Sequence, residues 1–273
     1  MNQEGATVRV WGCRGSLPVP GAATQRYGGD TSCYEIRDAA GYGLLIDCGS
    51  GMRALGEAMM QAGPPAELDI LLSHAHFDHL IGLGFFMPLL KCRTALRLWT
   101  TEPVERIAAA LQTLFGPPLW PMRIPGDYPL PIHRLAEGVT QIGPARVEHF
   151  PLHHPGGASG FRISLGGRMI CSVTDHEHGQ AGIDAGVRQA VKGADLMLYD
   201  AAYSEAEYAH KQGWGHSTWE EAQRVAEAAG VKHTLLVHHS PPATDDELDA
   251  KHALLSGARV RVTVARDGME IAL

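Results

Sequence analysis

The chain has 273 residues, of which 45% are hydrophobic and 19% charged, values that fit a globular protein with a substantial core. A net charge of -7 argues against broad electrostatic binding to an extended nucleic acid. The five cysteines form no close CxxC pair, so they favour neither a disulfide framework nor a cysteine-rich zinc site. Residues 1–7 lack the start of a leader and no apolar run has the length of a membrane span, so we expect a cytoplasmic protein.

The first predicted elements are short strands that end in glycine-rich loops. Strands are expected over 8–11, 33–36 and 43–46, followed by a helix over 52–62. Asp47 comes directly after the third of these strands. Its carboxylate has two possible roles, as a cap for the following helix or as a hydrogen-bonding partner of a functional loop.

The most informative stretch follows the next strand. An apolar run at 70–72 predicts a buried strand, and three histidines and one aspartate follow it within a few positions: His74, His76, Asp78 and His79. Imidazole and carboxylate groups that are buried together are costly unless they bind protons, each other or a metal. His74 and His76 alternate on an extended segment and therefore point the same way. Asp78 and His79 lie where the chain turns into an apolar segment at 80–86, for which we expect a helix.

The HxHxDH pattern at the end of an apolar strand resembles the signature of the metallo-β-lactamase fold superfamily. The resemblance covers nearly the whole chain and implies an α/β fold, an αββα sandwich, as a single domain over 1–273. It also implies two divalent metal ions, zinc or else manganese, with two further histidines and one bridging aspartate later in the chain. Asp47 takes the place of an aspartate that orients the metal-binding loop through hydrogen bonds.

The middle of the chain is expected to add one helix and four strands. A strand over 96–100 precedes a helix over 103–115 that has proline near its first turn, and three strands follow, over 132–135, 139–142 and 145–151. The segment 116–122 has too many prolines for regular structure. Its Trp120 and Met122 either shape a substrate pocket or cover the core, and we favour the core.

Two further motifs resemble metal-binding positions of the superfamily. His153 and His154 precede a glycine-rich turn and the sequence Gly160-Phe161-Arg162, as in the third motif of the phosphodiesterase branch, which implies that His154 is the ligand. A strand over 168–173 then leads to Asp175, in the place of the bridging aspartate, where two carboxylate oxygens can serve two cations. Whether four neighbouring histidines contribute is left open: His153, His176, His178 and His239.

The last part of the chain repeats the pattern of strands that end in polar residues. Strands over 194–199 and 234–237 lead to Asp200 and His238, and His238 takes the place of the last metal-binding histidine. Ser217 or Thr218 is expected to cap a helix over 219–229. A short helical stretch over 204–209, a helix over 246–256 and strands over 259–264 and 269–272 complete the prediction.

The resemblance implies one metal held by His74, His76 and His154 and another held by Asp78, His79 and His238, with Asp175 between them. Two adjacent metals generate hydroxide near neutral pH and brace the oxygens of the group under attack. That chemistry fits phosphodiesters, esters, thioesters and amides alike.

Gly215-His216-Ser217-Thr218 narrows the reaction, because it resembles the GHST motif of ribonuclease Z and related phosphodiesterases. There the histidine donates a proton or hydrogen bond to the phosphate and an acidic residue holds it. Asp200 stands in that place, although glutamate is the common residue. We therefore expect His216 and Asp200 to act in catalysis, together with Asp78.

The expected function is a phosphodiesterase that acts on a small substrate such as a cyclic nucleotide or cyclic phosphate. Ribonuclease Z itself is disfavoured, because its bacterial form has a long arm where this chain has room for one hairpin between His154 and Asp175. One alternative is a carbon-ester hydrolase, such as a lactonase or thioesterase, which would not need His216. Another is a non-catalytic metal-binding sensor. A homodimer is expected by analogy only.

Overall fold

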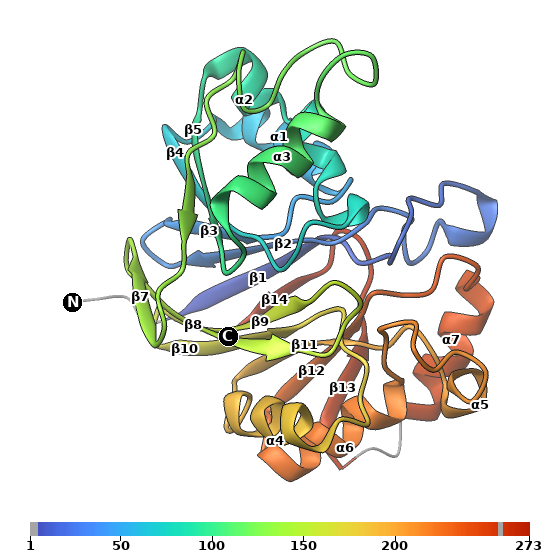
Figure 1. The fold of residues 1–273 in the computed structure, drawn as a ribbon. Helices are drawn as coiled ribbons and strands as arrows, with labels where there is room; N and C mark the ends of the chain where they lie inside the picture. Colours follow the sequence, from blue (N-terminus) through green and yellow to red (C-terminus); the bar gives the residue numbers. More distant parts are fainter. Residues whose placement is uncertain (1–4, 256–258) are drawn as a thin grey trace.

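The computed structural model describes residues 5–255 and 259–273, and in this part of the chain two mixed sheets of seven strands each lie face to face (Figure 1). The first sheet has the spatial order β14-β1-β2-β3-β4-β5-β6. Its strands are β1 (Ala6–Gly12), β2 (Cys33–Asp38), β3 (Gly43–Ile46), β4 (Glu67–Leu71), β5 (Ala95–Thr100), β6 (Ile132–Arg134) and β14 (Glu270–Ala272).

The second sheet has the order β13-β12-β11-β10-β9-β8-β7. Its strands are β7 (Val139–Ile142), β8 (Ala145–Leu152), β9 (Ala158–Leu165), β10 (Arg168–Val173), β11 (Leu196–Asp200), β12 (His233–Val237) and β13 (Arg261–Val264). Each sheet joins an antiparallel half to a parallel half, the parallel strands being β3 to β6 in one and β10 to β13 in the other.

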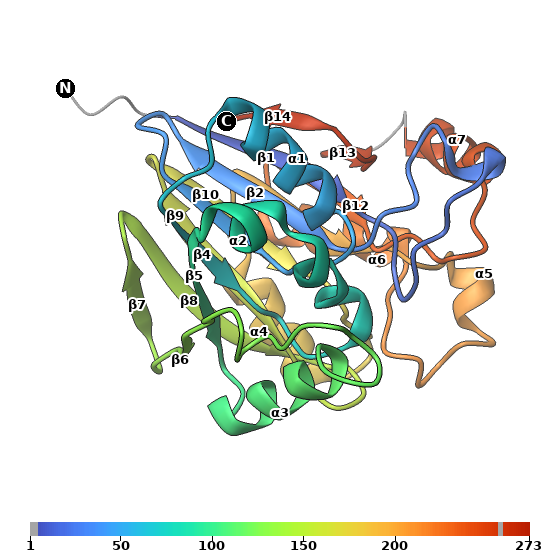
Figure 2. The same cartoon turned by 90° about the horizontal axis from the view of Figure 1, so that it is seen from above.

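Helices cover the outer faces of the two sheets (Figures 1 and 2). On the first sheet lie α1 (Met52–Ala62), α2 (Met87–Cys92) and α3 (Val104–Leu114). On the second lie α4 (Ala181–Ala190), α6 (Trp219–Ala229) and α7 (Asp245–Leu254), with the short α5 (Glu205–Tyr208) beside them. The fold is the αββα sandwich that the resemblance implied.

Three apolar layers hold this arrangement together. Side chains such as Val8 and Ile36 meet Ile163 and Leu198 between the sheets. A second layer lies under α1 and α3, and a third under α4, α6 and α7. Successive side chains of a strand point to opposite faces of its sheet, and apolar residues occupy both faces. Each sheet is therefore buried on two sides over most of its area.

The segment after the His-rich motif differs from its prediction. The helix expected over 80–86 is a 3-10 helix and not an α-helix, η3 (Ile81–Phe85), and a second 3-10 helix, η2 (Phe77–His79), precedes it. Gly82 lies so close to the backbone that a Cβ atom there would be 2.0 Å from the carbonyl oxygen of Gly49. Glycine also disfavours the α-helix, so tight packing governs the local conformation here. Helices α2 and α4 were not predicted.

The helix predicted over 246–256 corresponds to α7, which begins one residue earlier and ends at Leu254, while Ser256 lies outside the described residues. Thr218, and not Ser217, caps α6 by accepting a hydrogen bond from the backbone N–H of Glu221. None of the helices in the described ranges combines the length and apolar character needed to cross a bilayer.

Candidate metal centre

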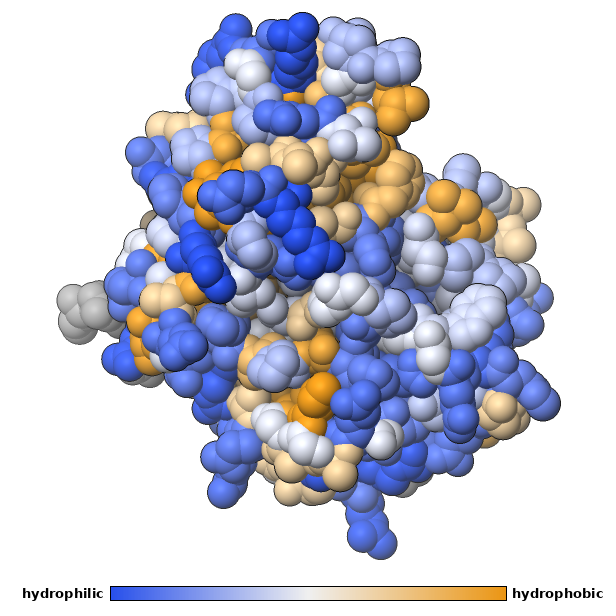
Figure 3. Space-filling model, in the orientation of Figure 1, coloured by the Kyte–Doolittle hydropathy of each residue, from blue (hydrophilic) through white to orange (hydrophobic). Residues whose placement is uncertain are grey.

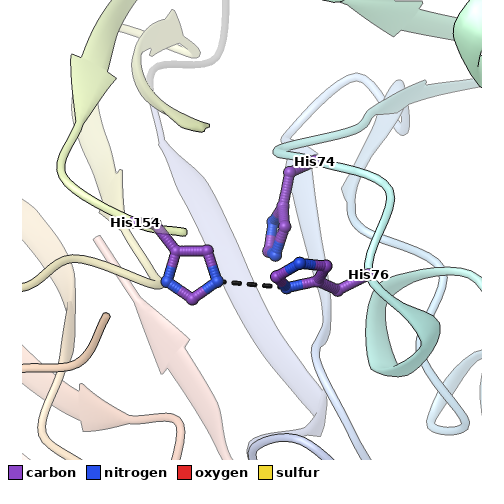
Figure 4. Close-up of side chains that lie close together, drawn as sticks. All are labelled: His74, His76 and His154. Carbon is purple, nitrogen blue, oxygen red and sulfur yellow. Dashed lines mark hydrogen bonds between the residues drawn. The ribbon is translucent and has the colours of Figure 1, made fainter. Parts of the chain in front are cut away.

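Three predicted ligands meet at the carboxyl end of β4. His74 and His76 follow this strand, and His154 reaches them from the β8–β9 loop (Figure 4). The Nε2 atom of His154 lies 3.0 Å from Nδ1 of His76, and the ring centroid of His74 is 4.4 Å from that of His76 and 4.9 Å from that of His154. The three rings converge on one point, as the alternation of His74 and His76 along an extended segment requires.

A second group of donors lies next to the first. It contains Asp78, His79, Asp175 and His238. Asp175 faces both histidines of this group: Oδ1 is 3.0 Å from Nε2 of His238, and Oδ2 is 3.2 Å from Nε2 of His79. The same Oδ1 atom is 3.9 Å from Nε2 of His154 in the first group. The Asp175 carboxylate therefore lies between the two groups, in the position proposed for a bridge.

The backbone turns sharply where three of the strands deliver their polar residues. Asp47, Asp175 and His238 follow β3, β10 and β12, with φ angles of 61°, 61° and 59°. These values lie in the left-handed region, which residues other than glycine seldom adopt. After these turns the Asp47 side chain contacts His79, and the Asp175 and His238 side chains contact each other, and the surrounding structure holds this strain.

The buried polar atoms of the centre fit metal ions. Nε2 of His74 is buried without a hydrogen-bond partner among the residues that the structure describes, and Nε2 of His79 and Oδ2 of Asp175 are buried and face each other at 3.2 Å without forming a hydrogen bond. Such atoms are rare and call for an explanation. Imidazole nitrogens and carboxylate oxygens are donors that zinc and other divalent metals accept. A pair of divalent cations would satisfy these atoms.

Electrostatics within the centre agree with this fit. Burial lowers the pKa of His74 well below its usual value, and the neighbouring His79 acts in the same direction, so His74 is neutral and able to bind a metal. Burial alone would raise the pKa of Asp175, but His238 and His79 hold it well below its usual value. Burial lowers the pKa of His79, yet the adjacent carboxylates raise it well above the ordinary value. Without a metal, protons on imidazoles balance the carboxylates.

Asp47 supports the second group from behind. Its Oδ2 atom accepts a hydrogen bond from Nδ1 of His79 at 2.8 Å, and its Oδ1 atom accepts one from the backbone N–H of Ser73 at 2.8 Å. Helix α1 receives no side-chain cap, so the alternative capping role is wrong. The carboxylate fixes the tautomer of His79 that leaves Nε2 free to face a metal.

Replacing Asp47 with asparagine should weaken metal binding by about 10- to 100-fold, because His79 loses the partner that orients it. Metal affinity measured by competition with a coloured chelator checks this. Asp69→Asn is the matched control, since Asp69 is also buried but bonds Arg97, Trp99 and Tyr42 away from the centre. Equal affinities in Asp47→Asn and wild type would contradict the role.

His216 and Asp200 form a pair at the edge of the second group. Nδ1 of His216 lies 2.8 Å from Oδ2 of Asp200, and the His216 ring stacks on His238 with centroids 4.6 Å apart. Aspartate is shorter than the glutamate common at this position, yet it reaches the ring from the end of β11. With Nδ1 donating to the carboxylate, Nε2 is the atom available for a substrate.

Glu177 has a structural role that the sequence did not reveal. It is buried, with a relative exposure of 4%, and its two oxygens accept hydrogen bonds from the backbone N–H groups of Gly213 and Gly215, each at 2.7 Å. The carbonyl of Gly215 in turn accepts from Nδ1 of His154 at 2.8 Å. The turn after Asp175 is thereby tied to the loop that carries His216. An acidic residue close to a glycine-rich loop in space gives no signal in the sequence.

The four histidines left open have partners outside the two groups. His153 and His239 contact the carbonyls of Glu177 and Ala265, at 3.0 and 2.8 Å. Nδ1 of His178 lies 2.8 Å from the hydroxyl of Ser217, and Nε2 of His176 lies 3.4 Å from Asp184. None of these four belongs to a cluster of metal-type donors in the described part of the chain.

Space for a ligand lies directly beside the first group. A small pocket of about 70 Å³ is lined by His74, His76, Glu102, Arg106 and the Gly156–Gly157 turn. A larger cavity, of about 550 Å³, lies on the outer face of the first sheet beside α1 and contains none of the clustered donors. Trp120 packs against Phe115 with ring centroids 5.5 Å apart, as the core interpretation predicted.

Two sheets packed between helices, with clustered histidines and aspartates where strands of both sheets end, define an αββα sandwich with a candidate metal centre. The chain belongs to the beta-lactamase superfamily, since the family model described as "Beta-lactamase superfamily domain" matches residues 42–239. This family is the one that the HxHxDH pattern indicated.

Individual proteins resemble the chain over most of its length. Ribonuclease Z of Gemmatimonas aurantiaca is 28% identical over an alignment of 282 positions. The alignment covers 84% of this chain and 86% of that protein. The metallo-beta-lactamase fold protein YhfI of Bacillus subtilis has a TM-score of 0.73 at 19% identity and covers 99% of this chain and 100% of its own. A diphosphatase of the PhnP family has a TM-score of 0.73 at 20% identity, covering 98% of this chain and 97% of its own. These two structures establish the shared fold.

Proposed function

We propose that the protein is a binuclear metal-dependent phosphodiesterase that acts on a small substrate, such as a cyclic nucleotide or cyclic phosphate. The observation that carries the proposal is the 2.8 Å contact between Asp200 and His216, with His216 stacked on the metal-type donor His238. The similarity to a ribonuclease Z, whose name denotes cleavage of RNA, supports the phosphodiester part.

Seven of the clustered donors would hold two divalent ions. His74, His76 and His154 would bind one, Asp78, His79 and His238 would bind the other, and Asp175 would contact both. Nitrogen and oxygen donors suit zinc best and allow manganese. When bound, such ions lower the pKa of a shared water and neutralise charge on the phosphate oxygens.

The residues of the chain supply the rest of the chemistry. The Asp200 carboxylate holds His216 through Nδ1, so the proton on Nε2 is available to the departing oxygen of the substrate. An imidazole suits this task because its ordinary pKa is near neutrality. Asp78 is held in place by the backbone N–H of Ser16, which donates to Oδ2 at 2.8 Å, and it contributes as a ligand.

The preference for a small substrate is supported by what lies between His154 and Asp175. This stretch contains the β9–β10 hairpin, with the tight turn after Leu165, and no inserted arm. The net charge of -7 also disfavours an extended RNA. Localisation in the cytoplasm belongs to the same proposal and agrees with five free cysteines, four of them buried.

A substrate panel tests the proposal. Purified protein loaded with zinc or manganese is assayed with cyclic nucleotides, bis(4-nitrophenyl) phosphate, a short RNA, a lactone and a thioester. We expect turnover of the small phosphodiesters to exceed that of the carbon esters by at least about 100-fold, because two adjacent cations brace the oxygens of a phosphate under attack and His216 assists the poor leaving groups of the cyclic nucleotides.

Each part of the proposal has a result that contradicts it. Hydrolysis confined to the lactone or thioester would show a carbon-ester hydrolase. Faster cleavage of the RNA than of every small diester would refute the small substrate. Tight metal binding without turnover of any compound would indicate a sensor.

A further inference from the structure

Three residues with exposed apolar side chains lie close along the chain to the candidate metal centre. Leu17, Phe77 and Trp214 have relative exposures of 54%, 44% and 61%. Each belongs to a different loop, and each is adjacent in sequence to a residue that contacts the centre. Most of the face in Figure 3 is hydrophilic, and exposed apolar groups that gather in one place mark sites for a ligand or partner.

The contacts of neighbouring residues place the backbone of all three residues close to the clustered donors. Leu17 follows Ser16, whose N–H donates to Oδ2 of Asp78 at 2.8 Å. Phe77 stands between His76 and Asp78 in the 3-10 helix η2. These two residues therefore border the centre on the side of the first sheet.

Trp214 borders the centre on the side of the second sheet. It lies between Gly213 and Gly215, whose N–H groups donate to the buried carboxylate of Glu177 at 2.7 Å each. The carbonyl of Gly215 accepts from Nδ1 of His154 at 2.8 Å. The ammonium of Lys211 lies 5.1 Å from the centroid of the Trp214 ring, which leaves the rest of that ring open to solvent. A loop anchored by Glu177 thus carries an exposed indole one residue from the Gly215 carbonyl that contacts His154.

We propose that Leu17, Phe77 and Trp214 form a subsite for a planar aromatic group, such as a nucleobase or aryl ring, on the part of the substrate that is not cleaved off. This inference rests on the proposed function and names its substrate class. Aromatic faces bind bases and aryl rings by stacking without reading their hydrogen-bond edges. A diester with only short alkyl groups cannot use this surface.

The test compares two ligands that differ only in this group. Calorimetry on the metal-loaded protein measures the Kd of phenylphosphonate and of methylphosphonate, which present the same phosphonate oxygens to the metals. We expect wild type to bind the phenyl compound about tenfold more tightly. Trp214→Ala and Phe77→Ala should each reduce that ratio to about twofold, while Val139→Ala, at an exposed apolar position on the edge strand β7, should leave it unchanged.

Kinetics give a second readout. Methyl 4-nitrophenyl phosphate and phenyl 4-nitrophenyl phosphate are cleaved by addition of water to phosphorus and loss of 4-nitrophenolate, which leaves methyl or phenyl phosphate. The leaving group is shared, so the change in the kcat/KM ratio between wild type and variant reports binding of the retained group. We expect this ratio to fall about fivefold in Trp214→Ala.

The outcomes separate the subsite from the reaction. Equal binding of the two phosphonates by wild type, or a ratio unchanged in both aromatic variants, overturns the subsite. A preference for the phenyl compound without turnover of any diester supports the subsite and refutes the proposed function. Sedimentation velocity measures the oligomeric state of wild type and variants. If the variants change their oligomeric state but keep the wild-type ratio of phenylphosphonate to methylphosphonate binding, these residues contact a second copy of the chain. That result would overturn the proposal.

Discussion

Asp175→Ala should bind at most one divalent ion per chain where wild type binds two, and the affinity for the remaining ion should fall by about 100-fold or more. The expected loss exceeds that of an outer hydrogen-bonding partner, because the Asp175 carboxylate faces both donor groups. Its Oδ1 atom lies 3.0 Å from Nε2 of His238 in the second group and 3.9 Å from Nε2 of His154 in the first. Removing the carboxylate takes one donor from each proposed metal. Elemental analysis after dialysis and a chelator titration measure the stoichiometry and the affinity.

Asp175→Asn keeps the volume of the side chain and guards against a folding defect. Its circular dichroism should match that of wild type, while it loses metal as the alanine variant does. Asp195→Asn serves as a control at a carboxylate that pairs with Lys232 at the far end of β11. Two ions retained at wild-type affinity in either Asp175 variant would exclude the bridging role.

His216→Ala should retain both metals and lose about 10²- to 10⁴-fold in kcat for phosphodiesters with poor, alkyl leaving groups. The loss should be below about tenfold for 4-nitrophenyl esters, since 4-nitrophenolate departs without a proton. The physical basis is the pair with Asp200, which directs Nδ1 of His216 to the carboxylate at 2.8 Å and leaves Nε2 for the substrate. Steady-state kinetics over a series of leaving groups give the slope that reports the acid.

His233→Ala is the matched control for this series. His233 is also buried and is the first residue of β12, at the end of the strand away from His238, and its Nε2 contacts the hydroxyl of Thr263 at 3.0 Å. This variant should keep the wild-type dependence on the leaving group. If His216→Ala loses the same factor for good and poor leaving groups, His216 is not the acid.

The parts of the fold and site that depend on local pattern were predictable. Helices α1 and α6 have the predicted bounds, because their apolar residues recur at helical spacing and a glycine follows α6. The HxHxDH stretch was predicted from residues that are neighbours in sequence. The positions of His154, Asp175 and His238 came from the order of motifs in a family, and the structure brings these three side chains together with the first four. Their metal-binding roles stay predictions, as does the single domain over 1–273.

Contacts between distant segments could not be predicted. Glu177 reaches Gly213 and Gly215 across 36 and 38 positions, and nothing in either segment signals the other. The 3-10 geometry within 80–86 has a similar cause, since the glycines there are packed against Gly49 and Trp120, which belong to other loops. Helix α4 was missed because its short stretch contains Gly182 and Gly186, which weaken the helical signal.

The left-handed turns at Asp47, Asp175 and His238 matter for attempts to transplant this centre into another protein. A designer who copies the seven donor side chains onto a scaffold whose strands end in ordinary extended or helical backbone would point them in the wrong directions. Two of the three turns use aspartate, a residue that tolerates this conformation better than most. The grafted unit therefore has to include each strand end with its following turn, and a valine or isoleucine at these positions would oppose the required geometry whatever ligands surround it.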